Sequence, residues 1–399
     1  MPGKSNDQNK TLWYNSTMPI IHTAVALCAV GAEKVVSNEL RKLGLAVSES
    51  GFGRIRFKAE LSGLYRALMG LRAADRVLLE AANFEARDFD ALFEGVREIP
   101  WEEYIPPHSA LTVSKVRTNR SKLEAETSIQ AVAHKAAAEK LCTKWGINRL
   151  PTEHGETAEL RVYIEKDQVS VLLDLSGPPL FKRGYRTSGG IAPLRESTAA
   201  AIILHSGWRR KFPLYDPFCG SGTIAIEAAM YAWNIAPGLG RHFALEKLLL
   251  GDQDTEQKLR QEFMEKVDFS RLVRISGSDS DSASVLAAQA NMKRALANGG
   301  APDSQPSFEL LEMKEAKSSG EPGFIITNPP YGRRLGNTES AEKTYSEMGT
   351  LDSRFPGWKL VLITEHPGFE SFFGRKADSC REITNGAIQS YLFQYEKLR

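Results

Sequence analysis

The residues with the clearest chemical potential form one short stretch, which reads Leu-Tyr-Asp-Pro-Phe-Cys-Gly-Ser-Gly-Thr from Leu214 to Thr223. The apolar run before it predicts the end of a buried strand, and the run rich in Ala, Ile and Met after it predicts a helix. Gly220 and Gly222 have no Cβ atom, so a ligand can approach the backbone closely in the turn. The free N–H groups at the start of the helix favour a carboxylate or a phosphate there.

Asp216 stands at the carboxyl end of the predicted strand, where its carboxylate could hold a cationic amino group. The methionine part of S-adenosylmethionine offers both a carboxylate and an ammonium group. The loop lacks the third glycine of the NAD pattern and the Gly-Lys-Ser/Thr ending of phosphate loops. A strand–helix turn that needs small residues only for packing is the alternative. We expect a site for this methyl donor, formed by Asp216, Pro217, Cys219, Gly220, Gly222 and Thr223.

A second apolar strand, predicted from Phe324, ends in Asn-Pro-Pro-Tyr. Two successive prolines fix φ and remove two N–H donors, so the strand must stop there. The carbonyl oxygens of Asn328 and Pro329 can accept hydrogen bonds from an exocyclic amino group, and Tyr331 offers a ring for a base to stack on. The alternative is a core strand that ends at prolines, with a buried Asn cap. We expect the catalytic residues to be Asn328, Pro329, Pro330 and Tyr331, with Asn328 also near the donor.

Several motifs occur in a fixed order along the chain: 182–186 (Lys-Arg-Gly-Tyr-Arg), 192–196 (Ala-Pro-Leu-Arg-Glu), the Asp216 loop, 277–281 (Gly-Ser-Asp-Ser-Asp) and 328–332. This ordered set resembles the bacterial THUMP-domain rRNA methyltransferases. From about Met18 onward, the chain is similar to their large-subunit rRNA guanine-N2 methyltransferases in single-module form. The resemblance implies a doubly wound, Rossmann-like α/β methyltransferase domain that follows an α+β ferredoxin-like/THUMP RNA-binding module. It also implies methyl transfer to the N2 amino group of a guanosine in 23S rRNA.

Three further acidic residues are candidate donor ligands. Asp279 ends the next predicted strand, where an acid commonly binds ribose hydroxyls. It lies much further from Asp216 than the about 20 residues usual in dinucleotide folds, but similar family members carry an insertion here, as this chain does at 236–269. Asp281 is either a second ligand or the N-cap of the helix predicted at 283–297. The resemblance also points to Glu312, near the adenine, where family members often have Asp.

The composition is that of an ordinary globular protein, with 42% hydrophobic and 25% charged residues and a net charge of +2. Bulk charge therefore does not indicate nucleic-acid binding, which would have to come from local patches. The four scattered cysteines form no zinc motif and fit a reducing cytosol, so we expect no structural metal and a cytoplasmic protein. The apolar run 18–32 is too short to span a bilayer and lacks a signal-peptide cleavage site.

The N-terminal half mixes predicted strands and helices, which indicates a small α+β module. Helices are predicted at 33–43 and 61–74, and strands at 54–58, 77–82 and 111–116. The segment 123–144 predicts a helix, and 160–164 and 169–175 predict a hairpin. With the resemblance, the expected organisation is a disordered tail at 1–17, a ferredoxin-like segment at 18–62, a THUMP domain at 63–176, a linker at 177–193 and a methyltransferase domain at 194–399.

Three basic stretches could contact RNA phosphates. They contribute the candidates Lys115, Arg117, Arg120 and Lys122, then Arg183 and Arg186, and finally Arg333 and Arg334. The alternatives are a solvated loop for the first stretch, a basic linker for the second and exposed loop arginines for the third. Taken alone the first stretch favours the solvated loop, whereas the family resemblance favours RNA binding.

The chemistry needs little acid–base help, because the donor is an activated sulfonium and the amine loses its proton late. The protein then acts mainly through orientation and proximity. Methylation at pyrimidine C5 would need a thiolate nucleophile. Cys219 lies instead in the loop expected to bind the methyl donor, residues 216–223, which we call the donor loop. There it is expected to be a small buried residue. Two alternatives stay open: amino-methylation of tRNA guanine or of adenine N6 in RNA or DNA, and a non-catalytic RNA-binding assembly factor.

Overall fold

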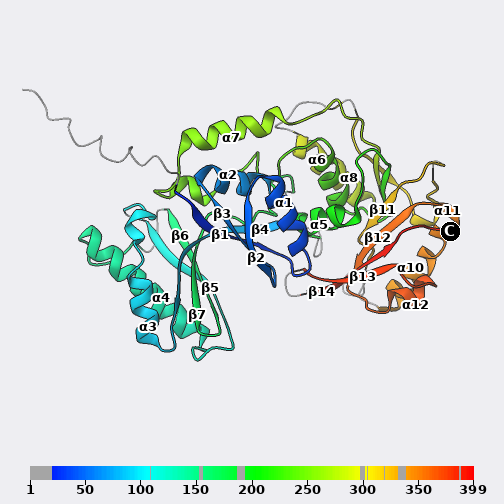
Figure 1. The fold of residues 1–399 in the computed structure, drawn as a ribbon. Coiled ribbons are helices and arrows are strands. Elements are labelled where there is room, and N and C mark those ends of the chain that lie inside the picture. The colour runs from blue at the N-terminus through cyan, green and yellow to red at the C-terminus, as the bar shows by residue number, and fades with distance from the viewer. Residues whose placement is uncertain are drawn as a thin grey trace, which may run out of the picture.

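The computed structural model describes residues 20–107, 109–151, 156–186, 194–296, 302, 304–318, 320–330, 338–385 and 388–399. Within them the chain forms two seven-stranded sheets, one from the N-terminal half and one from the C-terminal half (Figure 1). No helix in this described part is long and apolar enough to cross a lipid bilayer. The two sheets lie side by side and are joined by the segment that follows β7.

The first unit has the β-α-β-β-α-β order of a ferredoxin-like fold. β1 pairs with β3 and with β4, so the strand order is β2-β3-β1-β4. Its elements are β1 (His22–Cys28), α1 (Glu33–Lys42), β2 (Ala46–Gly51), β3 (Arg54–Ala59), α2 (Leu61–Gly70) and β4 (Ala74–Glu85). The predicted boundary between residues 62 and 63 would separate α2 and β4 from the strands on which they pack. We therefore propose a boundary after β4.

The second unit extends the same sheet, because β7 pairs with β4. It consists of α3 (Phe89–Arg97), the 3-10 turn η1 (Trp101–Glu103), β5 (Ala110–Asn119), α4 (Glu126–Trp145), β6 (Thr157–Glu165) and β7 (Gln168–Asp174). β5 runs parallel to β6 at the outer edge. Ile129, Ala133 and Ala137 recur at helical spacing in α4 and are buried with the sheet core. Helices α3 and α4 therefore cover one face of these strands (Figure 1).

The C-terminal half is a doubly wound sheet with the strand order β10-β9-β8-β11-β12-β14-β13. Its first five strands are parallel, and β14 runs antiparallel to β12. The strands are β8 (Leu214–Asp216), β9 (Ile275–Asp279), β10 (Ser307–Leu310), β11 (Phe324–Thr327), β12 (Lys359–Thr364), β13 (Ser379–Asn385) and β14 (Ile388–Tyr395). The order reverses between β8 and β11, where doubly wound sheets bind their ligands.

Helices and short turns cover both faces of this second sheet (Figure 1). They are α5 (Glu196–Ser206), α6 (Thr223–Ala232), α8 (Ser282–Leu296), η3 (Met313–Glu315), α10 (Thr338–Met348), α11 (Leu351–Arg354) and α12 (Phe369–Phe373). Two further elements, η2 (Ala244–Lys247) and α7 (Gln253–Glu265), instead bury Leu245, Leu259 and Phe263 in the core of the N-terminal half. The predicted insertion at 236–269 contains α7, which packs on α2 of the first unit. The insertion therefore bridges the two halves of the chain.

Two sequence-based expectations needed correction. The helix predicted at 61–74 ends at Gly70, because the backbone N–H groups of Arg72 and Ala73 donate to the Glu39 carboxylate instead, each at 3.0 Å. The strand predicted at 111–116 is longer than expected, because β5 continues to Asn119 and contains Arg117 as well as Lys115. In each case a partner distant in sequence replaced the local pattern.

Arg183 joins the two halves of the chain. Its side chain is only 2% exposed and forms an ion pair with the buried Glu227 of α6, with 3.4 Å between Nε and Oε1. Its guanidinium also donates to the carbonyl oxygens of Leu180 and Arg72. Tyr185 donates to the same Glu227 oxygen at 3.1 Å. A side chain enclosed in this way cannot reach RNA, so the prediction that Arg183 contacts phosphates is wrong.

We expect Arg183→Ala to lower the free energy of unfolding by roughly 3–5 kcal/mol, because it leaves the Glu227 carboxylate buried without its cation. Urea denaturation followed by tryptophan fluorescence measures this change. Arg209→Ala is the matched control, because Arg209 is exposed, and it should be nearly neutral. Equal stability of the two variants would contradict the structural role of Arg183.

Candidate active site

The donor and acceptor motifs meet where two neighbouring strands end. β8 and β11 are parallel and adjacent, with Leu214 opposite Phe324. At their carboxyl ends the Thr327 hydroxyl donates to Oδ1 of Asp216 at 2.6 Å, and both side chains are buried. Asn328 follows directly and is 9% exposed. One hydrogen bond thus fixes the start of the donor loop against the start of the Asn-Pro-Pro motif.

The donor loop is held by the strand beside it. The backbone N–H of Cys219 donates to the Ser278 carbonyl oxygen at 2.9 Å, and that of Gly220 donates to the Asp279 carboxylate at 2.9 Å. Gly220 and Gly222 have φ values of +50° and +82°, in the left-handed region that favours glycine. A Cβ atom on Gly222 would lie 2.9 Å from the Ala288 Cβ of α8. The loop therefore needs glycine at 222 both for its conformation and for its packing.

The acidic residues after β9 have different roles. One oxygen of Asp279 accepts from Gly220, and the other accepts from the Asp281 N–H at 3.0 Å, which holds this carboxylate against the donor loop. Asp281 accepts from the backbone N–H and the hydroxyl of Ser284 at 2.9 and 2.7 Å, and from the Ala283 N–H at 3.3 Å. The geometry therefore makes Asp281 the N-cap of α8, and a role for it in binding the donor stays a prediction.

A cavity of about 450 Å³ opens at this edge of the sheet. It brings together six of the residues predicted for the donor and acceptor sites, whereas Asp216, Cys219, Gly222, Thr223, Asp281 and Pro329 do not line it. Its lining is Pro217, Phe218, Gly220, Asp279, Ser280, Ser284, Glu312, Met313, Lys314, Asn328, Pro330, Ser340, Thr344 and Glu347. Tyr331, Arg333 and Arg334 lie outside the described residues.

Sequence reasoning missed the wall that α10 gives to this cavity. Ser340, Thr344 and Glu347 recur at a spacing of three and four residues, so they share one face of that helix. The other faces bury Ala341, Tyr345 and Met348 in the core. A polar helix face shortly after the Asn-Pro-Pro motif in the sequence could have indicated this wall of the cavity. Glu312 does line the cavity as predicted, although its carboxylate also pairs with Lys314 at 2.6 Å.

Burial controls the electrostatics of the donor loop. Desolvation raises the pKa of Asp216 to about 7, against the lowering effect of its hydrogen bonds from Thr327 and from the Phe218 N–H. Desolvation, together with the nearby Asp216 and Asp279 carboxylates, also raises the pKa of the Cys219 thiol. The thiol therefore stays protonated, which agrees with the absence of a nucleophilic role for it in the predicted chemistry.

Arg186 supports the donor loop from the side. Its guanidinium donates to the Thr223 hydroxyl at 2.6 Å and to the Leu194 carbonyl oxygen at 3.1 Å. It also pairs with Glu196 at 3.6 Å, and its side chain is 12% exposed. These contacts contradict the prediction that Arg186 binds RNA. They also occupy the hydroxyl of Thr223, the first residue of α6.

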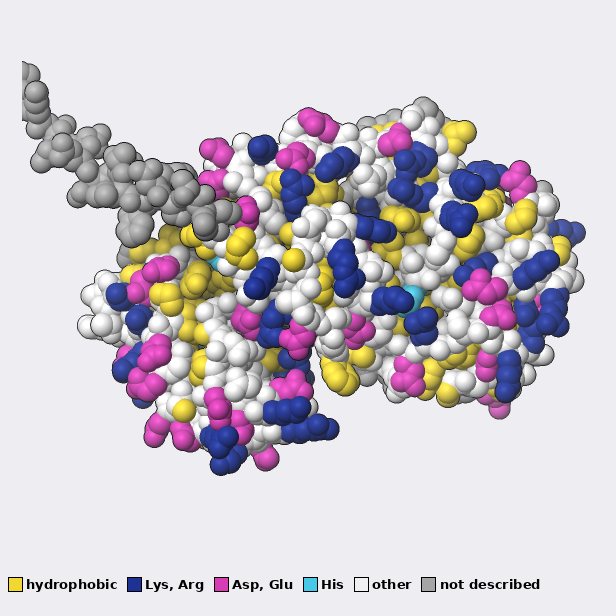
Figure 2. Space-filling model, viewed as in Figure 1, with side chains coloured by type: hydrophobic (Ala, Val, Ile, Leu, Met, Phe, Trp, Pro, Cys, Tyr) yellow, Lys and Arg dark blue, Asp and Glu magenta, His cyan; other side chains and the backbone are white. Residues whose placement is uncertain are grey.

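The predicted basic stretch near residue 120 lies at the outer edge of the N-terminal sheet. Lys115 is half-buried, whereas Arg117, Arg120 and Lys122 are exposed. Arg117 pairs with Glu126 at 2.7 Å. Exposed Lys and Arg side chains are spread over both lobes of the molecule, and a notch separates the lobes on the face that Figure 2 shows. The role of the basic stretch in RNA binding therefore stays a prediction.

Comparisons with known proteins match all three parts of the chain. Residues 23–78 match the RlmL ferredoxin-like domain, 86–174 the THUMP domain, and 183–394 the methyltransferase domain described as RMKL-like. The chain belongs to the RMKL-like methyltransferase family. It is 36% identical to the putative RNA methyltransferase YpsC of Bacillus subtilis over 94% of this chain and 96% of that protein.

Two further comparisons bear on length and on cofactor. The ribosomal RNA large subunit methyltransferase K/L of Cellvibrio japonicus is 33% identical over 94% of this chain, but this chain spans only 51% of that protein. The crystal structure of SMU.472, a putative methyltransferase complexed with SAH, has a TM-score of 0.85 and 37% identity. It covers 96% of this chain and 100% of that one. S-adenosylmethionine is therefore the cofactor of this methyltransferase domain.

The site fits this cofactor on its own geometry. The loop presents backbone N–H groups at the start of α6 to a carboxylate, and the open space around Gly220 leaves room for close approach. The buried Asp216 supplies the negative charge that an ammonium group requires, and Asp279 supplies acceptor oxygens for hydroxyl groups. Within the described ranges, no cluster of three or more His, Cys, Asp or Glu side chains could hold a metal ion.

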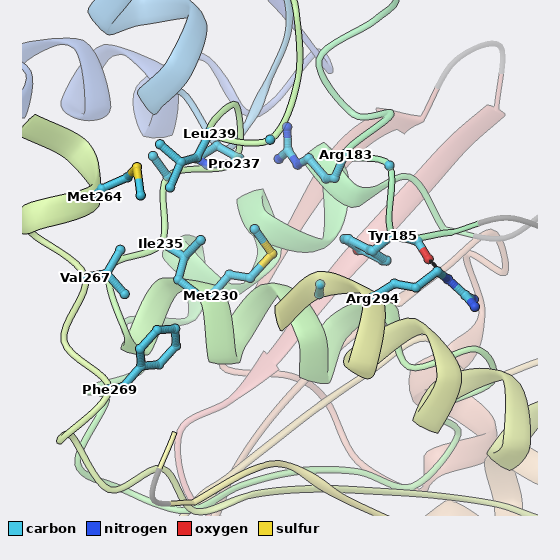
Figure 3. A pocket seen from close by; sticks show the side chains of 14 residues that line it. Arg183, Tyr185, Met230, Ile235, Pro237, Leu239, Met264, Val267, Phe269 and Arg294 are labelled. Atoms are coloured by element: carbon cyan, nitrogen blue, oxygen red, sulfur yellow. Dashed lines mark hydrogen bonds between the residues drawn. The ribbon is translucent and has the colours of Figure 1, made fainter. Parts of the chain in front are cut away.

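A separate cavity of about 420 Å³ lies at the junction of the two halves and not at the carboxyl edge of the sheet. Figure 3 shows Met230 and Ile235 on its apolar side and Tyr185 with Arg294 on its polar side. Nε of Arg294 donates to the Tyr185 carbonyl oxygen at 2.7 Å. This cavity contains no residue predicted for donor or acceptor binding, so it is not the active site of the methyltransferase.

The raised pKa of Asp216 makes donor binding depend on pH. We expect the affinity for S-adenosylmethionine to fall about tenfold for each pH unit below 7, because the carboxylate must lose its proton to hold the ammonium group. Isothermal titration calorimetry from pH 5.5 to 7.5 measures this. Asp216→Asn should bind the donor weakly at every pH. An affinity of the unaltered protein that does not change over this range would exclude Asp216 as the ammonium ligand.

Asp216→Asn should weaken donor binding but should stabilise the folded protein. The folded pKa of Asp216 lies above the roughly 4 of an unfolded chain, so its contribution to stability declines as the pH rises from about 4 to about 7. At pH 8 we therefore expect Asp216→Asn to raise the free energy of unfolding by roughly 1–3 kcal/mol. Urea denaturation at pH 8 without donor checks it.

Proposed function

We propose that this protein transfers a methyl group from S-adenosylmethionine to the exocyclic N2 amino group of a guanosine in large-subunit rRNA. The observation that carries the proposal is the pairing of β8 with β11, which places Asn328 and Pro329 beside the donor loop. A THUMP domain in the same chain supports an RNA substrate. The name of the K/L relatives supports large-subunit rRNA, although this chain spans about half of their length. Such a substrate places the enzyme in the cytoplasm.

In the proposed mechanism the protein holds two groups in line. S-adenosylmethionine supplies an electrophilic methyl group when it is bound. Asp216 and the first N–H groups of α6 fix the methionine end of the donor, and Asp279 fixes its ribose. The carbonyl oxygens of Asn328 and Pro329 accept hydrogen bonds from the amino group of the base and orient its lone pair. The rate gain then comes from proximity and orientation, and the amine proton leaves late, to water or to these carbonyls.

The base must leave its stack to reach this site, since Asn328 and Pro330 line a cavity. Asn328 and Pro329 would accept an amino group from guanine or from adenine alike. The choice of guanine therefore rests on the family resemblance. The identity of the methylated nucleoside is the observation that separates this proposal from adenine-N6 chemistry.

We expect N2-methylguanosine from unmodified large-subunit rRNA incubated with the protein and donor carrying a labelled methyl group. Unmodified tRNA and DNA, treated in parallel, should give no labelled product. Digestion to nucleosides and mass spectrometry identify the product. N6-methyladenosine, or product from tRNA or DNA, would retain the mechanism and replace the substrate. Donor binding without any methylated nucleoside would favour a non-catalytic assembly factor.

Asn328→Ala tests the acceptor motif directly. We expect turnover to fall at least 100-fold, because the variant loses the side-chain carbonyl oxygen that orients the amino group. Donor affinity should change less than threefold, since Asp216 and Asp279 are intact. Single-turnover methylation and calorimetry separate the two effects. Full activity of this variant would remove Asn328 from the mechanism.

The basic edge of the N-terminal sheet gives a test on RNA affinity. Replacing Lys115, Arg117, Arg120 and Lys122 by Gln should weaken rRNA binding and flatten the plot of log affinity against log salt concentration, by about one unit of slope for each lost phosphate contact. Filter binding at several salt concentrations measures the slope. The matched control replaces by Gln four exposed basic residues outside this stretch, which are Lys258, Arg209, Lys293 and Lys376. An unchanged slope in the first variant would make the stretch an ordinary solvated surface.

A further inference from the structure

The helix-free face of the N-terminal sheet contains a cavity of about 450 Å³. Side chains alternate along its strands: Ala24, Ile55 and Leu173 face the core under the helices, whereas Val25 and Leu172 form a separate small cluster on the other face. The cavity lies on this second face and is lined by Val25, Glu49, Gly51, Phe52, Arg54, Arg56, Asn83, Tyr163, Glu165, Gln168, Ser170 and Leu172. The active-site cavity shares none of these residues.

An exposed aromatic residue stands at the rim of this cavity. Phe52, in the turn between β2 and β3, is 83% exposed and has a φ of +42°. In the same cavity the Arg54 guanidinium lies 4.5 Å from the ring centroid of Tyr163. In the described part of the chain, no carboxylate lies within ion-pair distance of Arg54. A ring and a guanidinium plane on one wall are the groups on which an unpaired base stacks.

The polar groups of the cavity favour a base over a phosphate. Arg56 is neutralised by Glu49 and by Glu80, the latter at 2.7 Å. Glu165, at the end of β6, adds a second carboxylate to the lining. Carboxylates repel phosphate, but they accept hydrogen bonds from the N–H edges of bases. The Asn83 amide, which donates to Ser170 at 2.9 Å, adds further hydrogen-bonding capacity.

The turn that carries Phe52 lies near a contact between the N-terminal sheet and β13 of the methyltransferase domain. Gly53, beside Phe52, accepts a backbone hydrogen bond from Cys28 at 2.9 Å, and Val30 forms an antiparallel bridge with Thr384 of β13. β13 ends and β14 begins just beyond the carboxyl end of β12, because Thr364 pairs with Tyr391 and Asn385 with Ile388. The carboxyl end of β12 borders that of β11, where Asn328 follows.

We propose that this cavity binds an unpaired base of the RNA substrate, stacked on Phe52 and hydrogen-bonded by Asn83 and Glu165. The proposal rests on the RNA substrate of the proposed function and adds a second contact point, away from the methylated base. A base held there fixes the path of the strand between the N-terminal module and the active site. The exposure of Phe52 is then used by RNA and not by a protein core.

Phe52→Ala is the direct test, with an unmodified large-subunit rRNA transcript as the probe. Loss of one stacked base should weaken binding roughly ten- to hundredfold. The salt slope should stay unchanged, because no charge is removed. Phe52→Trp should keep the affinity. Phe89→Ala is the matched control, because Phe89 is exposed on the helical side of the same sheet, and it should bind RNA like the unaltered protein.

Photo-crosslinking adds a second readout. With benzoylphenylalanine at position 52, we expect crosslinks to the transcript that unlabelled transcript competes away. Equal affinity of Phe52→Ala and the unaltered protein, or crosslinks from a ribosome-precursor preparation to protein alone, would overturn the proposal. Methylation of the same transcript by the unaltered protein reports the proposed function separately. If the unaltered protein methylates the transcript but Phe52→Ala binds it equally well, only the proposed role of this cavity is wrong. If the unaltered protein does not bind the transcript, both this role and the proposed function are wrong.

Discussion

The active site depends on one hydrogen bond, between the Thr327 hydroxyl and the Asp216 carboxylate. Parallel strands on either side of a switch point send their helices to opposite faces of the sheet, which leaves a crevice between their carboxyl ends. Each of the two essential motifs begins at one wall of this crevice. Because both partners are buried, neither wall can shift without breaking a bond in a water-poor environment. The distance between donor and acceptor is therefore set by the sheet.

The N-terminal module is held to this crevice by buried polar contacts. Arg72 lies between α2 and β4 of the first unit and donates to the Ile235 carbonyl oxygen at 2.6 Å, while its own carbonyl oxygen accepts from Arg183. Arg183 in turn pairs with Glu227 of α6, the helix that begins at the donor loop. Buried charges of this kind do little for net stability but tolerate few alternative arrangements. The module and the active site are therefore fixed relative to each other.

Sequence reasoning succeeded where the chemistry is local. The donor loop, the Asn-Pro-Pro turn and the strands that precede them combine glycine, proline and apolar runs whose meaning needs no distant partner. Charged residues were harder, because a run of arginines looks the same whether it faces solvent or a buried glutamate. The prediction that Arg183 and Arg186 bind RNA therefore fails, because Arg183 pairs with the buried Glu227 and Arg186 donates to Thr223. The wall formed by α10 was missed for the same reason, since its partners lie on other elements.

The buried position of the Asp216 carboxylate lowers the stability of the folded protein. Its carboxylate is buried, and no Lys, Arg or His side chain in the described ranges forms an ion pair with it. The hydrogen bonds from Thr327 and Phe218 offset only part of the desolvation, which is why its pKa is raised. A protein selected for stability alone would place a neutral side chain there. The retained acid is the complement of a cation that the described part of the chain does not supply, and the ammonium group of the methyl donor is such a cation.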